Sequence, residues 1–75
     1  MNPSEDTLAR AVAGAHALRS GTWASVEALA LLAIETEDRS LLTQAQQAAA
    51  GLKGAGSWEA VRALAILARA ERLTS

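Results

Sequence analysis

Few residues of this 75-residue chain could take part in acid–base chemistry. His16 is the only histidine, and a histidine can change its charge near neutral pH and so act as a general base. It follows Val12 and Ala13 at helical spacing, with no cysteine, serine pair or carboxylate beside it. Such surroundings are typical of a surface histidine, and we predict that the chain is not an enzyme and has no catalytic residue.

Three acidic residues lie close together and could hold a divalent cation: Glu35, Glu37 and Asp38. Their spacing lacks the ligand pattern and the turn glycine of a calcium loop. Asp38 is also well placed to cap a helix that begins at Arg39. Because the chain has no cysteine, a thiolate metal site and a disulfide framework are excluded. We therefore predict no metal site and no cofactor.

Charge and hydrophobicity limit the classes of partner. Seven Lys and Arg residues against eight Asp and Glu give a net charge of -1, and no basic stripe is present to neutralise a phosphate backbone. Nucleic acid is therefore excluded as a predicted partner. The apolar run 28–34 is much shorter than the roughly 20 residues that span a bilayer. The N-terminus also lacks a signal-peptide pattern, so we expect a cytoplasmic protein that does not enter a membrane.

The composition favours helices over strands. Alanine occurs nineteen times and leucine eleven times, against five valines and isoleucines, and Pro3 fits the first turn of a helix. Caps and breaks predict four helices over residues 3–19, 23–35, 39–53 and 58–73. The predicted N-caps are Asn2, Thr22 or Ser20, Asp38, and Ser57. Short connections make neighbouring helices antiparallel, so we predict one all-α domain over residues 1–75.

An internal repeat with an offset of 35 residues is the strongest pattern in the sequence. Eight of the thirteen residues 21–33 recur at this offset, and the only two tryptophans of the chain are among them. The recurring residues are Gly21, Trp23, Val26, Ala28, Leu29, Ala30, Leu32 and Ala33. The units span approximately 5–38 and 39–73, so the helices form two repeated α-hairpins. These hairpins can close as a four-helix bundle or stack as a short solenoid.

The start of the second helix in each unit carries a family resemblance. Gly21-Thr22-Trp23 and Gly56-Ser57-Trp58 open these helices, and Ala-Leu-Ala follows at 28–30 and 63–65. Together with a period close to about 34 residues, this pattern resembles the tetratricopeptide-like helical repeats. The resemblance covers most of the chain. It implies protein binding through helical faces and does not identify the partner.

The second and fourth helices each have an apolar face that we expect to form the core. Positions that share this face follow from the rotation of about 100° per helical residue. The predicted core residues are Trp23, Val26, Leu29, Trp58, Val61 and Leu64. If a tryptophan is buried there, its truncation to alanine is expected to cost about 3–5 kcal/mol.

The opposite faces of these two helices give the predicted interaction surface. Leu31 and Ile66 occupy equivalent positions on faces that are otherwise mostly polar. Charged residues nearby, including Glu59 at i, i+3 spacing from Arg62, form either a solvated face or the rim of an interface. The predicted surface consists of Leu31, Ile66, Glu27, Arg62 and Arg69. A second copy of the chain could cover the matched apolar pair, although packing within one chain could also hide it.

Two functions remain open from the sequence. The first is a non-catalytic protein–protein interaction or self-assembly module, a homodimer built through the outer faces of the second and fourth helices. The second is a small-ligand-binding protein or accessory enzyme subunit with a pocket near His16. Pockets need several well-placed polar groups, and few are found near His16, so the sequence favours the first function.

Overall fold

Hydroxyl and carboxylate side chains set the starts of the helices. The computed structural model describes residues 3–19 and 21–74, and its elements are α1 (Pro3–Ala17), α2 (Trp23–Thr36), α3 (Arg39–Ala50) and α4 (Trp58–Thr74). Thr22 Oγ1 accepts a hydrogen bond from the Ser25 N–H at 3.2 Å. Asp38 Oδ1 accepts one from Ser40 N–H at 2.8 Å, and Ser57 Oγ accepts one from Ala60 N–H at 3.1 Å. Each bond satisfies an N–H that the helix itself cannot pair.

These caps confirm the predictions for Thr22, Asp38 and Ser57. The other proposed caps, Asn2 and Ser20, lie outside the described residues. The third helix is shorter than predicted, because it ends at Ala50 rather than at Lys53. There the Leu52 N–H donates to the Ala49 carbonyl at 3.1 Å, a tighter turn than the α-helical one.

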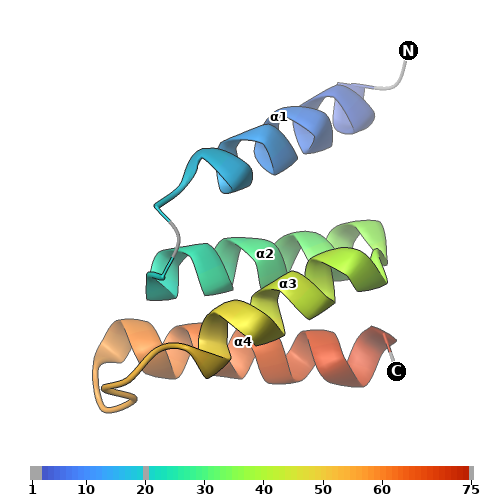
Figure 1. The fold of residues 1–75 in the computed structure, drawn as a ribbon. Helices are drawn as coiled ribbons and strands as arrows, with labels where there is room; N and C mark the ends of the chain where they lie inside the picture. The colour runs from blue at the N-terminus through green and yellow to red at the C-terminus, as the bar shows by residue number, and fades with distance from the viewer. Residues whose placement is uncertain (1–2, 20, 75) are drawn as a thin grey trace.

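The helices form a stack in which α2 is central. It packs most extensively against α4 and α3 and less against α1 (Figure 1). Among the described residues, α1 contacts no helix other than α2. A closed four-helix bundle would also place α1 against a second helix. The described residues are instead arranged as an elongated stack, with extents of 42 × 26 × 19 Å.

The core is rich in alanine where the helices meet. Six alanines have no exposed surface: Ala30, Ala33, Ala45, Ala60, Ala63 and Ala70. Larger side chains surround them and join one hydrophobic cluster, with Val26, Leu29, Leu32, Leu41, Leu42 and Leu67 buried. Small residues at the contacts allow close approach of the helices but bury little apolar area each.

The predicted core is confirmed for Val26 and Leu29 of α2 and wrong for Trp58 and Val61 of α4. Val26 and Leu29 are buried, whereas Trp23 and Leu64 are half-buried. Trp58 is 70% exposed and Val61 is 49% exposed, although both were expected inside. The physical reason is the position of α4 at the end of the stack. Since α4 packs only against α2 and α3 within the described chain, no helix covers its outer face.

The two tryptophans should therefore differ in their contribution to stability. Trp58→Ala is expected to lower the free energy of unfolding by about 0.5 kcal/mol or less, as for other exposed positions. Trp23→Ala removes a half-buried ring packed against the core and is expected to cost about 1–3 kcal/mol. Urea unfolding followed by circular dichroism measures both. Equal losses for the two variants would contradict this arrangement.

Candidate interaction surface

The exposed side of α2 is a narrow stripe that contains Leu31. Because three helices pack around α2, only Ala24, Leu31 and Glu35 are exposed between Trp23 and Glu35. Leu31 is 42% exposed, which is unusual in a helix whose other large apolar side chains are buried or half-buried. The sequence analysis placed Leu31 on an outer face, and the structure agrees.

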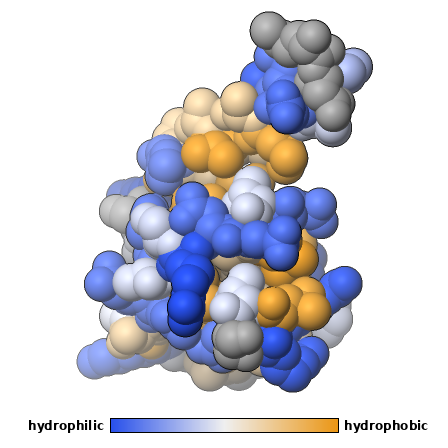
Figure 2. All heavy atoms as spheres, turned by 90° about the vertical axis from the view of Figure 1, so that its right-hand side faces the viewer, coloured by the Kyte–Doolittle hydropathy of each residue, from blue (hydrophilic) through white to orange (hydrophobic). Residues whose placement is uncertain are grey.

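Leu31 lies between two adjoining hollows on one side of α2. The first has a volume of about 320 Å³ and the second about 240 Å³. The first is lined only by apolar residues and glycine: Ala11, Gly14, Ala15, Leu18, Ala28, Leu31 and Leu32. We call this first hollow the Leu31 groove; it runs between α1 and α2. In the side view of Figure 2, hydrophobic residues form a band beneath the polar N-terminal end of α1.

An ion pair between α2 and α4 borders the second hollow. Arg62 Nε donates to Glu27 Oε1 at 2.8 Å, and the two residues stand at equivalent positions of the 35-residue offset. Their side chains are 49% and 22% exposed, so the pair adds little stability because water competes with it. Its role is to fix charged groups beside Leu31. The predicted pairing of Arg62 with Glu59 is not the one observed.

The structure brings together three of the five predicted surface residues. Leu31, Glu27 and Arg62 all line the second hollow, with Ala24 and Ala28. Ile66 does not match Leu31 as expected, because it is half-buried and packs against the core. The equivalent positions differ because the neighbours of α2 leave its Leu31 side open, whereas Ile66 lies against the cluster through which α4 packs. Arg69 is exposed on α4 and lines none of the three hollows described for this part of the chain.

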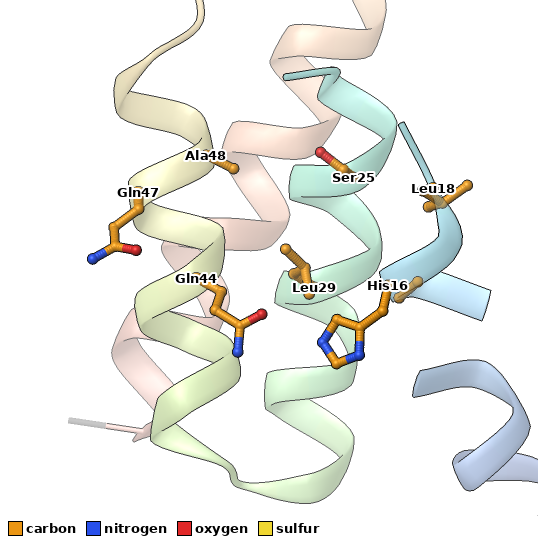
Figure 3. A pocket seen from close by; sticks show the side chains of 8 residues that line it. His16, Leu18, Ser25, Leu29, Gln44, Gln47 and Ala48 are labelled. Carbon is orange, nitrogen blue, oxygen red and sulfur yellow. The ribbon is translucent and has the colours of Figure 1, made fainter. Parts of the chain in front are cut away.

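A third hollow, with a volume of about 400 Å³, lies near His16 between the end of α1, α2 and α3. In Figure 3 the His16 ring and the Gln44 amide approach its mouth from opposite sides, whereas Gln47 points away. Gln44 Nε2 is 3.4 Å from Ser40 Oγ, and Ser25 Oγ donates to the Thr22 carbonyl at 2.7 Å. These local bonds leave few groups to act on a ligand.

The sequence analysis missed Gln44 as a neighbour of His16. A signal was present, because Gln44 lies at helical spacing between Leu41 and Ala48, both on the packed side of α3. The hollow itself depends on how α1 and α3 sit across α2. No local pattern in the sequence encodes that placement.

The acidic residues at the α2–α3 connection serve as helix ends. Glu37 caps the C-terminus of α2 in a left-handed conformation with φ 55°, and Asp38 caps α3. Within residues 3–19 and 21–74, no group of three or more His, Cys, Asp and Glu side chains is arranged to hold a metal ion. None of the helices in these ranges has the length and hydrophobicity needed to cross a membrane.

Comparison with protein families, with curated proteins and with solved structures gave no match for this chain. Its function is therefore inferred from its own residues and their arrangement.

Proposed function

We propose that this chain is a non-catalytic protein–protein interaction module that self-associates as a homodimer through the Leu31 groove. The observation that carries the proposal is the exposure of two leucines at an opening with no polar side chain. Leu18 is 43% and Leu31 is 42% exposed there. Exposed apolar surface of this kind gains about 25 cal/mol for each Å² that a partner removes from water.

A second copy is the occupant that best fits this groove. Two-fold contacts use the same surface on both partners, so a protruding side chain and a hollow must lie side by side. Leu31 lines the groove together with Gly14 and Ala28, and its exposed part can enter the groove of the other copy. The charged pair Glu27–Arg62 stands beside Leu31 and would form the polar rim of the contact.

The weak attachment of α1 also supports self-association. Only Ala15 of α1 is buried, and α1 packs against α2 alone within the described chain. A second copy seated over the groove would contact α1 and α2 together and cover their shared apolar side. A small core with many alanines buries little apolar area, and the dimer contact would add to this buried area and to the stability of the chain. The proposal also includes two expectations from the sequence, namely the resemblance to tetratricopeptide-like repeats and the cytoplasmic location.

The hollow at His16 favours a second candidate function, the binding of a small ligand. Its volume of about 400 Å³ is adequate, and His16 and Gln44 could both hydrogen-bond a guest. We rank this function second because two exposed polar side chains give little orientation to a ligand.

Leu31→Glu should abolish self-association without unfolding the chain. A charge at this exposed position has little effect inside one chain but would be desolvated in the dimer. For the unaltered chain, the thermal midpoint is expected to rise by roughly 3–5 °C for each tenfold increase in concentration. For Leu31→Glu, the midpoint should not depend on concentration. Calorimetry at several concentrations provides the measurement.

The matched control for this prediction is Val61→Glu, which places the same charge at an exposed position on another helix. This control should keep the concentration dependence of the unaltered chain. Ile66→Glu is unsuitable as a second interface variant, because Ile66 packs against the core. The homodimer proposal fails if Leu31→Glu and the unaltered chain respond to concentration in the same way.

A further inference from the structure

The outer face of α4 is a second apolar surface, distant in the stack from the Leu31 groove. We define it by Trp58, Val61 and Ala65, which follow one another at helical spacing and are all exposed. Within the described chain, α4 packs against α2 and α3 and against no helix on this side. The exposed tryptophan and valine leave apolar area in contact with water, which a docked partner would cover.

The equivalent stripe in α2 is covered by other helices of the same chain. Trp23, Val26 and Ala30 correspond to Trp58, Val61 and Ala65 at the 35-residue offset. Val26 and Ala30 have no exposed surface, and α2 packs chiefly against the hairpin formed by α3 and α4. A helical hairpin is therefore what this pattern of residues accommodates. The outer face of α4 repeats the pattern without the hairpin.

The charged residues beside the stripe indicate which charge a hairpin stacked on α4 should carry. At the edge of the covered stripe, partly exposed Glu27 of α2 pairs with Arg62 of α4 at 2.8 Å. The residue equivalent to Glu27 on α4 is Arg62 itself, so the sign on the receiving face is reversed. Arg62 donates to Glu27 through Nε, and an acidic residue of a stacked hairpin, where the α3–α4 hairpin carries arginine, would share this guanidinium with Glu27. Like charges at this point would repel.

A second copy of this chain does not meet these requirements. The α3–α4 hairpin covers α2 with apolar residues that include Leu41, Leu42 and Ala45. The corresponding residues of the first hairpin are Asp6, Thr7 and Arg10, which are polar and exposed. Stacking a second copy through its first hairpin would bury two charged residues against Val61. Pairing two α4 faces would instead supply one helix in place of the two-helix hairpin that covers α2.

We propose that the outer face of α4 is the docking surface for a helical hairpin of a partner protein. The packed face of that hairpin carries alanine and leucine, as in α3–α4, and an acidic side chain in place of Arg62. This inference does not rest on the Leu31 homodimer, because Trp58, Val61 and Ala65 line neither the Leu31 groove nor the hollow beside it, although Arg62 borders both surfaces.

An extended chain provides the probe for this proposal. Residues 37–75 are fused after Glu71, which keeps the 35-residue offset, and the appended copy carries Arg62→Glu. Trp23→Phe, together with Trp58→Phe in the appended copy only, leaves the original Trp58 as the sole tryptophan. Its fluorescence emission and its quenching by acrylamide then report whether the outer face of α4 is covered. The unextended Trp23→Phe chain gives the baseline.

We expect the Trp58 emission to shift to shorter wavelength and its quenching to fall when the hairpin is appended. The thermal midpoint of an extended chain that retains Trp23 should rise by about 5 °C or more, because each stacked repeat adds an interface. Keeping Arg62 in the appended copy should reduce this rise. Val61→Glu on the receiving face should remove it, although the same change should barely affect the unextended chain.

Three results would overturn the proposal. The first is a Trp58 that stays exposed in the extended chain, including a chain whose appended hairpin does not fold, since stacking should fold it. The second is a thermal midpoint of the extended chain that does not change with Val61→Glu. The third is burial of Trp58 in the unextended chain as its concentration rises, because a second copy would then be the occupant.

Discussion

Leu67→Ala is expected to cost about 2–5 kcal/mol, because it removes most of a buried side chain and leaves a cavity in the core. Leu67 is 7% exposed and joins the cluster through which α4 packs against α2. Domains of this size rarely have more than about 3–5 kcal/mol in total. The variant should therefore be partly or wholly unfolded at room temperature, as measured by urea titration and circular dichroism.

Leu73→Ala is the matched control for this prediction. It makes the same chemical change in the same helix, but Leu73 is 59% exposed, so the expected loss is about 0.5 kcal/mol or less. Comparable losses for the two leucines would mean that α4 does not pack through the side that contains Leu67.

Ala63→Leu should destabilise the chain by about 1–3 kcal/mol because it adds volume where two helices touch. Ala63 has no exposed surface and lies in the packed face of α4, between the buried residues Ala60 and Leu67. The larger side chain has no space unless α2 and α4 move apart. Thermal unfolding at low protein concentration gives the change in stability without a contribution from association.

Ala65→Leu is the control that separates the effect of crowding at a helix contact from the effect of the Ala→Leu substitution itself. Ala65 is exposed on the outer face of α4, two residues from Ala63, so the added side chain meets no helix within the described chain. We expect a change within about 0.5 kcal/mol in either direction. A loss for Ala65→Leu as large as that for Ala63→Leu would contradict the orientation of α4.

Features determined by neighbouring residues could be predicted from the sequence. The starts of α2, α3 and α4 follow from Thr22, Asp38 and Ser57, whose side chains bond to N–H groups two or three residues later. That Val26 and Leu31 lie on different sides of α2 follows from helical periodicity. These predictions hold because they do not depend on which helix lies beside which.

The burial of equivalent residues could not be predicted, because it depends on the order of the stack. Val26 and Val61 occupy equivalent positions of the sequence repeat, yet one is fully buried and the other is 49% exposed. Leu31 and Ile66 differ in the opposite sense, with the residue of the internal helix more exposed, because the neighbours of α2 and α4 lie on different sides. A sequence repeat makes each unit locally alike, but an end of the stack lacks the neighbour that an internal unit has.

Contacts between segments that are distant along the chain also could not be predicted from the sequence. Glu27 and Arg62 form an ion pair although they are equivalent positions of two units, and Arg62 had a nearer acidic candidate in Glu59. The hollow that joins His16 to Gln44 requires the placement of α1 and α3 on either side of α2. In both cases the separation along the chain gives no local pattern to detect.

The mass of the unaltered chain in solution, measured by light scattering coupled to size exclusion over a range of concentrations, tests the proposed homodimer most directly. Leu31→Glu and Val61→Glu are measured beside it. We predict a mass twice that of the 7.8 kDa chain at high concentration for the unaltered chain and for Val61→Glu, with Leu31→Glu remaining a monomer. A mass of one chain at every concentration, or a dimer that Leu31→Glu leaves intact, would contradict self-association through the Leu31 groove.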